Sequence, residues 1–243
     1  MESNLKLNRR VEPELLDELP PDDSRARRSR QDLRRLNSLM GHAEIVARAL
    51  ARASGGTGIK RIVEIGAGDG RFSLSVARRL APRFPGVNIM LVDRQHIVSE
   101  ETQRRFREMG WSCEAAQADV FDWLSRSCPQ AGDFIVANLF LHHFSEVRLR
   151  KLLSLVAERA RCLAACEPRR SRPVLAASRS LGLIGCNAVT RHDAVISVRA
   201  GFRGKELSNL WTLDGGWLLE EREAGLFSHL FTARRVDPER PRS

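Results

Sequence analysis

Residues 61–70 have the sequence RIVEIGAGDG, an apolar run that passes into three alternating glycines. The apolar run predicts a buried strand, and the residues after Gly70 have the apolar spacing of a helix. Glycine is needed in such a loop because side chains would keep its backbone away from a ligand. A dinucleotide-binding fingerprint would require glycine or alanine where this chain has Arg71. The stretch therefore predicts a strand, a ligand-binding loop and a helix.

Strand and helix patterns alternate from this stretch onward. The candidate strands are residues 61–65, 87–93, 112–117, 133–140 and 162–167, and the candidate helices are residues 70–81, 99–109, 120–126 and 145–160. Two apolar runs, 217–223 and 226–234, flank Ala224 and Gly225 and predict a hairpin. We expect an α/β fold: a Rossmann-like, doubly wound sheet, mostly parallel with a C-terminal antiparallel hairpin, in a three-layer sandwich.

The two ends of the chain differ from this pattern. Residues 20–35 contain paired prolines, then acids, then an arginine-rich run with few apolar residues. Apolar residues recur at helical spacing over 32–53, interrupted at Gly41, which predicts two amphipathic helices. We expect an N-terminal arm and helical lid (1–58), a ligand-binding domain (59–236) and a disordered tail (237–243).

Two acidic residues follow the next two strands. Asp93 ends the second strand, where its carboxylate can accept hydrogen bonds from both hydroxyls of a ribose. Enzymes that use NAD also have an acidic residue at this place. Asp119 follows the third strand, where it can accept a hydrogen bond from the amino group of an adenine while Val120 packs on the ring. Each acid could instead cap the helix that follows it.

The strand, the glycine loop, the two acids and the terminal hairpin together resemble the class I S-adenosylmethionine (SAM)-dependent methyltransferase family, over about residues 35–235. The segment at the end of the fourth strand resembles the small-molecule, quinone-biosynthesis-like branch. The resemblance implies SAM as cofactor. Glu64 would orient its methionine amino group, Asp93 would bind its ribose, and Asn138 would face its methionine end. The glycine loop would be lined by Gly66, Ala67, Gly68 and Gly70, and the adenine held by Asp119 and Val120.

Methyl transfer from a sulfonium is an in-line displacement, so a base is needed only if the acceptor must lose a proton. Ligands in such sheets bind beyond the carboxyl ends of the strands, which places residues 138–144 beside the methyl group. His143 in this segment is one candidate general base, although it could simply cap the next helix. His192, next to Asp193, is the second catalytic candidate.

Apolar residues dominate the segment 181–202, which predicts a hydrophobic acceptor pocket roofed by the N-terminal helices. The aromatic strand-four motif of nucleobase N-methyltransferases is missing, because Asn138 is followed by Leu139 and Phe140. No cluster of Asp, Asp and Asn follows strands four and five, so we predict no metal. The expected function is methyl transfer to oxygen or carbon of a small hydrophobic molecule, which is phenolic, quinone-like or polyketide-derived.

Composition bears on the alternatives. The net charge of +10 comes mostly from arginine and the chain has no tyrosine, so nucleic-acid binding is disfavoured. The alternatives are an RNA or protein methyltransferase guided by the arginine-rich arm, a noncatalytic SAM-binding protein and an enzyme that uses NAD. The five cysteines lack zinc or redox spacing and are expected to be reduced. We expect a cytoplasmic protein without a membrane span; its oligomeric state stays open.

Overall fold

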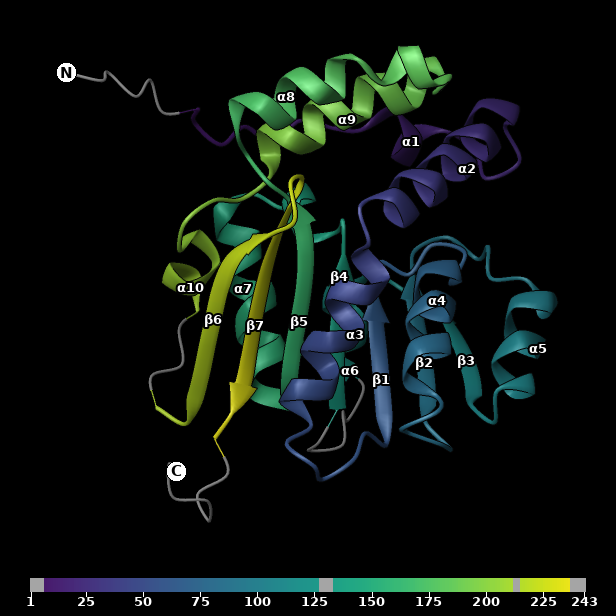
Figure 1. The fold of residues 1–243 in the computed structure, drawn as a ribbon, viewed down its shortest axis with the longest axis vertical. Coiled ribbons are helices and arrows are strands. Elements are labelled where there is room, and N and C mark those ends of the chain that lie inside the picture. Colours follow the sequence, from purple (N-terminus) through teal and green to yellow (C-terminus); the bar gives the residue numbers. More distant parts are fainter. Residues whose placement is uncertain (1–6, 127–132, 212–214, 237–243) are drawn as a thin grey trace.

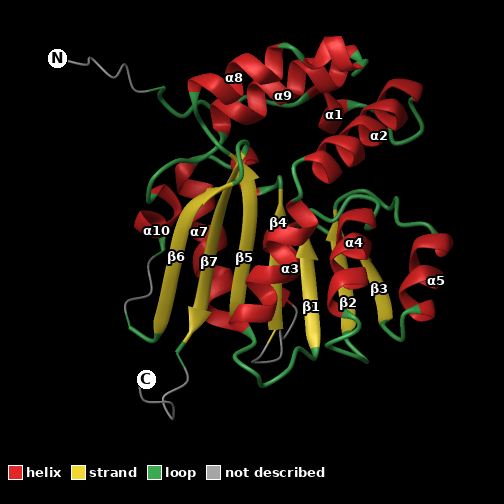
Figure 2. Ribbon diagram, viewed as in Figure 1, coloured by secondary structure: helices red, strands yellow, loops and turns green. Residues whose placement is uncertain are grey.

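The fold is organised around one mixed β-sheet (Figures 1 and 2). The computed structural model describes residues 7–126, 133–211 and 215–236; the predicted tail (237–243) and Cys128 lie outside them. Seven strands have the order β3-β2-β1-β4-β5-β7-β6, and β7 runs in the direction opposite to the other six. They are β1 (Arg61–Ile65), β2 (Asn88–Asp93), β3 (Ser112–Gln117), β4 (Asp133–Asn138), β5 (Ala160–Pro168), β6 (Trp217–Ala224) and β7 (Ser228–Arg235). The predicted parallel sheet with a terminal antiparallel hairpin is confirmed.

Helices cover both faces of the sheet. One face carries α3 (His42–Ala53), α4 (Arg71–Leu80) and α5 (Glu100–Glu108), and the other carries α6 (Val120–Arg126), α7 (Glu146–Arg159) and α10 (Glu206–Leu210). Adjacent strand residues enter opposite layers of the core: Ile62 packs with the α3 and α4 side, and Val63 packs with the α6 and α7 side. The central strands are therefore continuously apolar because both of their faces are buried.

A second group of helices lies across the carboxyl ends of the strands, at the top of Figure 1. It consists of α1 (Leu15–Glu18), α2 (Ser24–Leu39), α8 (Arg172–Arg179), η2 (Leu181–Ile184) and α9 (Ala188–Ala200). The predicted break at Gly41 is present, with φ of +68°, and separates α2 from α3. The sequence assigned α3 to the lid, but this helix packs against α4 and the sheet.

The sequence did not predict α8 and α9. Helix α9 contacts α1, α2 and α8, so its apolar residues are distributed around the axis and form no single stripe. None of the helices in the described part of the chain has the length and apolarity needed to cross a lipid bilayer. The four described cysteines are free thiols, and burial raises the pKa of Cys162 to about 12.

The hairpin is joined to α10 by one buried carboxylate. Glu221 on β6 accepts hydrogen bonds from the backbone N–H groups of Leu207 (3.0 Å) and Ser208 (2.7 Å) at the start of α10. The Ser208 hydroxyl (2.6 Å) and His229 Nε2 (2.8 Å) also contact this carboxylate. Burial opposes ionisation of Glu221, but these hydrogen bonds lower its pKa. A carboxylate with so many donors fixes the hairpin against the second layer of helices.

We expect Glu221→Gln to lower the free energy of unfolding by about 2 kcal/mol, because the charge-assisted hydrogen bonds are lost. The loss should shrink as pH falls through the lowered pKa of Glu221, where the native carboxylate itself becomes protonated. Chemical denaturation at pH 7 and at a series of pH values below the ordinary glutamate pKa of 4.5 measures both effects. Glu220→Gln, at an exposed position on the same strand, is the matched control.

Candidate active site

A cavity of about 860 Å³ opens at the carboxyl ends of the central strands. Its floor is formed by the ends of β1, β2 and β4, and its roof by the N-terminal segment and α2. This is the edge at which open α/β sheets bind ligands. The predicted residues that line it are Glu64, Gly66, Ala67, Gly68, Asp93, Asp119, Val120, Asn138 and His143. Gly70 is not among the lining residues and is the N-cap of α4 (Arg71–Leu80).

The glycine loop is held in a conformation that favours glycine. Gly66, Gly68 and Gly70 have φ values of +71°, +54° and +73°. A Cβ on Gly66 would lie 2.1 Å from the ring of Phe140, so the loop and the end of β4 are in direct contact. The loop is also tied to β2, because Gly68 N–H donates to Asp93 Oδ2 at 2.8 Å.

The two acids bind backbone groups and also line the cavity. The second oxygen of Asp93 accepts a hydrogen bond from Gln95 N–H at 2.8 Å. Asp119 Oδ1 accepts one from Phe121 N–H at 2.8 Å, which is the capping contact considered from the sequence. Each carboxylate oxygen can accept more than one hydrogen bond, so these contacts leave acceptor capacity on the cavity side.

Glu64 has an unusual environment for a carboxyl group. Its side chain is buried at the end of β1, and its Oε2 has no hydrogen-bond partner among the described residues. Burial raises the pKa of Glu64 to about 8, although Ser73 opposes the shift. The carboxyl is therefore mostly neutral at pH 7 when the cavity holds no ligand. An unpaired buried acceptor of this kind fits a cationic donor such as a ligand amino group.

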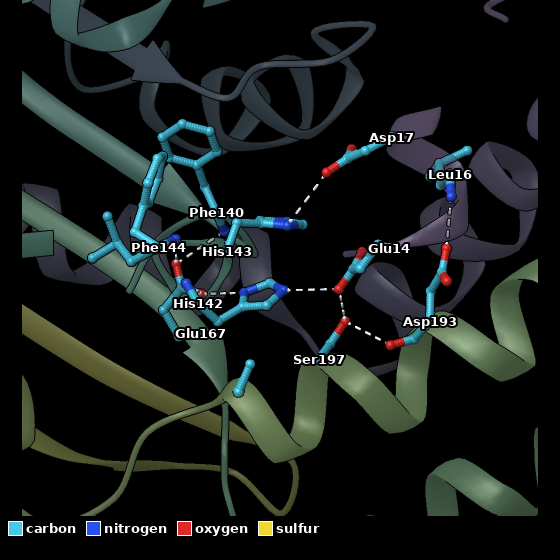
Figure 3. A network of polar contacts seen from close by, with 12 residues as sticks. Glu14, Leu16, Asp17, Phe140, His142, His143, Phe144, Glu167, Asp193 and Ser197 are labelled. Carbon is cyan, nitrogen blue, oxygen red and sulfur yellow. Dashed lines mark hydrogen bonds and ion pairs between the residues drawn. The ribbon is translucent and has the colours of Figure 1, made fainter. Parts of the chain in front are cut away.

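Two adjacent histidines follow β4 in the short helix η1 (Leu141–His143). His142 is buried between two carboxylates: Nδ1 lies 2.7 Å from Glu167 Oε2, and Nε2 lies 3.2 Å from Glu14 Oε1 (Figure 3). Burial alone would lower the pKa of His142, but these two hydrogen bonds raise it to about 9. Glu14, despite its burial, has its pKa lowered to about 2, chiefly by His142. His142 is therefore a fixed cation at neutral pH.

His143 has the opposite character. Its ring stacks on His142 with a centroid separation of 4.3 Å, and its Nδ1 lies 3.5 Å from Asp17 Oδ2. Burial and then the positive charge of His142 lower the pKa of His143. The ring stands beside Phe140 in the cavity wall (Figure 3). The geometry thus supplies a neutral imidazole that can accept a proton.

Glu14, His142 and His143 offer ligand atoms within 4.8 Å of one another, so a metal site must be considered. The two rings, however, are stacked on each other with an interplanar angle of 31°. Both nitrogens of His142 are also already hydrogen-bonded to carboxylates. The cluster as folded is better suited to holding protons than to coordinating an ion.

The second catalytic candidate lies elsewhere. His192 is about half exposed on α9, outside the cavity, with its Nδ1 3.0 Å from Asp193 Oδ1. The predicted hydrophobic pocket is also not formed by the segment 181–202: within the described residues, Ser197 is the member of this segment that lines the cavity. Leu183 and Ile184, both in η2, are 89% and 60% exposed.

Sequence reasoning missed three residues that build the site. Glu14 and Glu167 hold His142, as described above. His42, at the start of α3, lies 2.9 Å from Asn138 Oδ1 through Nδ1 and 2.7 Å from Ser228 Oγ through Nε2. Burial lowers the pKa of His42 to about 4, so it is neutral and its Nδ1–H donates to Asn138. The signal in the sequence that could have indicated His42 is its position as a polar residue at the start of an otherwise apolar helix pattern.

The arginine-rich run lies on α2, which begins at Ser24. Arg25, Arg28 and Arg34 form ion pairs with Asp23, Asp32 and Asp69. These charges are partly neutralised within the chain, which gives no support to an electrostatic guide for nucleic acid.

Part of the chain is similar to a known protein family. Residues 62–163 match the model of a family described as a methyltransferase domain. Among curated protein sequences, none is similar enough to this chain to match. The solved structures described next have low sequence identity to this chain, so their likeness shows the fold alone.

Three solved structures illustrate the likeness. An O-methyltransferase family protein from Burkholderia thailandensis has 20% identity and a TM-score of 0.61, covering 90% of this chain and 62% of its own. The plantazolicin methyltransferase BpumL, in complex with SAH, has 11% identity and a TM-score of 0.64, covering 88% and 92%. The mitomycin 7-O-methyltransferase MmcR has 19% identity and a TM-score of 0.59, covering 91% and 60%. This chain thus spans about three fifths of the length of the first and third.

The contact between Gly66 and Phe140 can be tested directly. We expect Gly66→Ala to lower the free energy of unfolding by about 2 kcal/mol more than Gly86→Ala, since overpacking typically costs 1–3 kcal/mol. Gly86 is a matched control because its φ of +69° carries the same backbone strain but its Cβ would meet nothing within 4 Å. Urea denaturation of the two variants measures the difference, and equal losses would contradict the packing described here.

Proposed function

We propose that this chain is a class I SAM-dependent methyltransferase that methylates a hydroxyl oxygen of a small, partly apolar molecule. The match of residues 62–163 to a methyltransferase-domain model supports this proposal. SAM supplies an electrophilic methyl group bonded to a sulfonium sulfur. The enzyme must align that group with the acceptor oxygen, exclude water and accept the proton of the hydroxyl. The observation that carries the proposal is a neutral His143 in the same cavity as the glycine loop and the unpaired carboxyl of Glu64.

The residues around the cavity suit the cofactor. Glu64, buried and lacking a partner on Oε2 among the described residues, would bind the amino group of the methionine moiety. Asp93 would accept hydrogen bonds from the ribose hydroxyls, and its hydrogen bond from Gly68 N–H would keep the loop beside them. Asp119 and Val120 would hold the adenine, and Asn138, oriented by His42, would face the methionine end.

His143 is the proposed proton acceptor, in agreement with one of the two candidates from the sequence. The cationic His142 beneath it disfavours a second positive charge, so His143 is neutral before the reaction. The proton that it receives can pass to Asp17, which is about half exposed and 3.5 Å from Nδ1. His142 itself is a poor acceptor because it is already protonated at neutral pH.

The acceptor is proposed from the walls near His143. Phe140 and Phe144 pack edge to face at 5.1 Å beside it, and Leu16 and Leu33 face the same cavity. Such walls suit a flat, apolar ring system that carries a hydroxyl, such as a phenol. The neighbours from Burkholderia thailandensis and the mitomycin 7-O-methyltransferase are named as O-methyltransferases, which favours oxygen over carbon for this chain.

Cofactor binding should be linked to ionisation of Glu64. Because its pKa is about 8 in the empty cavity, the bound amino group should drive loss of its proton at pH 7. We therefore expect release of up to about one proton on SAM binding, with affinity rising as pH approaches 8. Calorimetry at pH 7 in buffers of different ionisation enthalpy measures this, and Glu64→Gln removes this proton release. A buffer-independent heat in the native protein would rule out the linkage.

The catalytic assignment is tested with labelled SAM and a panel of simple phenols. We expect methylation by the native protein. In His143→Gln, kcat should fall by at least about 100-fold, because a positioned base contributes roughly 10²–10⁴-fold. The Kd for SAM should not change. His192→Gln, which alters the other candidate histidine, should keep the native kcat. A normal rate in His143→Gln would exclude it as the base, and SAM binding without methylation of any phenol would exclude this acceptor class.

A further inference from the structure

The segment 7–19 crosses the site before the chain enters α2. Its position is fixed at one end by Arg9, whose guanidinium donates to the carbonyl oxygens of Ala200 (2.8 Å), Phe144 (2.9 Å) and His142 (3.1 Å). Arg9 also stacks over the Phe202 ring at 4.7 Å. These contacts bind the segment to the same turn that carries the two histidines.

The other end is fixed by α9. Both carboxylate oxygens of Asp193 accept hydrogen bonds, each 2.9 Å long, from the backbone N–H groups of Leu15 and Leu16 at the start of α1. Ser197, one turn further along α9, donates its hydroxyl to Glu14. Glu14 is thereby buried between α9 and η1, although it comes from a segment that is otherwise largely exposed (Figure 3).

We propose that Glu14 is a positioning residue that clamps His142 from the side opposite Glu167 and so fixes the ring on which His143 stacks. This inference rests on the proposed function of His143. It assigns part of the site to the N-terminal segment, outside the residues that match the methyltransferase domain. Glu14 touches no reacting atom and acts through the histidine pair.

The charges around His142 explain why two carboxylates are required. The ring faces Glu14 from the N-terminal segment, Glu167 from β5, His143 from η1 and, beyond it, Asp17 from α1. The His142 ring is only 2% exposed, and a cation that is so deeply buried needs compensating negative charge. With Glu167 alone, the second nitrogen of the ring would lose its charged acceptor. His142 would then hold its proton less tightly and be free to rotate.

The test is a comparison of Glu14→Gln with Glu18→Gln in the full chain. The first substitution keeps the size of the side chain and an oxygen that can accept from His142, but it removes the charge. Glu18 is the last residue of α1, the short helix that follows Glu14, and it is exposed, so its variant controls for a general change in the segment. Ring-labelled histidines are followed by NMR over pH 6–10 without cofactor, and the His142 signal is identified with His142→Gln.

We expect the His142 titration to fall by about 1–3 pH units in Glu14→Gln, since an opposite charge at this distance shifts a pKa by that amount. It should not move in Glu18→Gln. With SAM and a phenol that the native protein methylates, kcat should fall about tenfold in Glu14→Gln with unchanged Kd for SAM. Asp193→Asn, which weakens the cap on α1, should lower kcat in the same direction.

An unmoved His142 titration in Glu14→Gln would overturn the clamp. A shifted titration with an unchanged kcat would overturn its role in the reaction. Because the NMR titration needs neither cofactor nor acceptor, it gives a result even if no phenol is methylated. Failure of the clamp is therefore distinguishable from failure of the proposed function.

Discussion

The buried carboxylate of Glu167 at the end of β5 organises the site. Its Oε1 accepts hydrogen bonds from the N–H groups of Phe140 (3.0 Å) and Leu141 (2.8 Å), and its Oε2 lies 2.7 Å from His142 Nδ1. A fully buried carboxylate is costly unless donors surround it, and here they all come from one turn after β4. The turn begins at Leu139, the described non-glycine residue with positive φ (+52°). Glu167 offsets the cost of this strained backbone by binding the residues that follow it.

The orientation of this turn connects the two halves of the site. Because Leu139 redirects the chain, Phe140 packs onto Gly66, and the side chain fills the space that any residue other than glycine would need. The ligand loop after β1 and the histidine turn after β4 are therefore one packed unit. Asp93 holds the same loop from β2 through Gly68. A change at any of these contacts should be transmitted to both the glycine loop and the histidine turn.

The sequence predicted the sheet well because buried parallel strands have a strong local signature. Each central strand is apolar on both faces, and each is closed by glycine or a polar residue at the ligand edge. Asp93 was predicted as a site residue because it ends an apolar strand, and Asp119 because it follows the third strand. Glu64 was predicted through the family resemblance. The pairing of Glu14 with His142 could not be predicted, because 128 residues separate them and Glu14 sits in a polar arm with no periodic pattern. Helix α9 was missed because it is surrounded by other helices and has no single apolar stripe.

The balance of charge in the site has a consequence for ligand exchange. The Glu14, His142 and Glu167 cluster carries one positive and two negative charges at neutral pH, and Glu64 can add a further negative charge when a cation approaches. In the proposed reaction, a net negative site of low exposure would favour a sulfonium over the uncharged thioether that remains after methyl transfer. The same field would disfavour a free anionic acceptor, so the hydroxyl of the proposed acceptor should enter protonated and lose its proton only as the methyl group moves. A neutral His143 beside a permanently charged His142 meets that requirement, because it can take the proton without having been protonated beforehand.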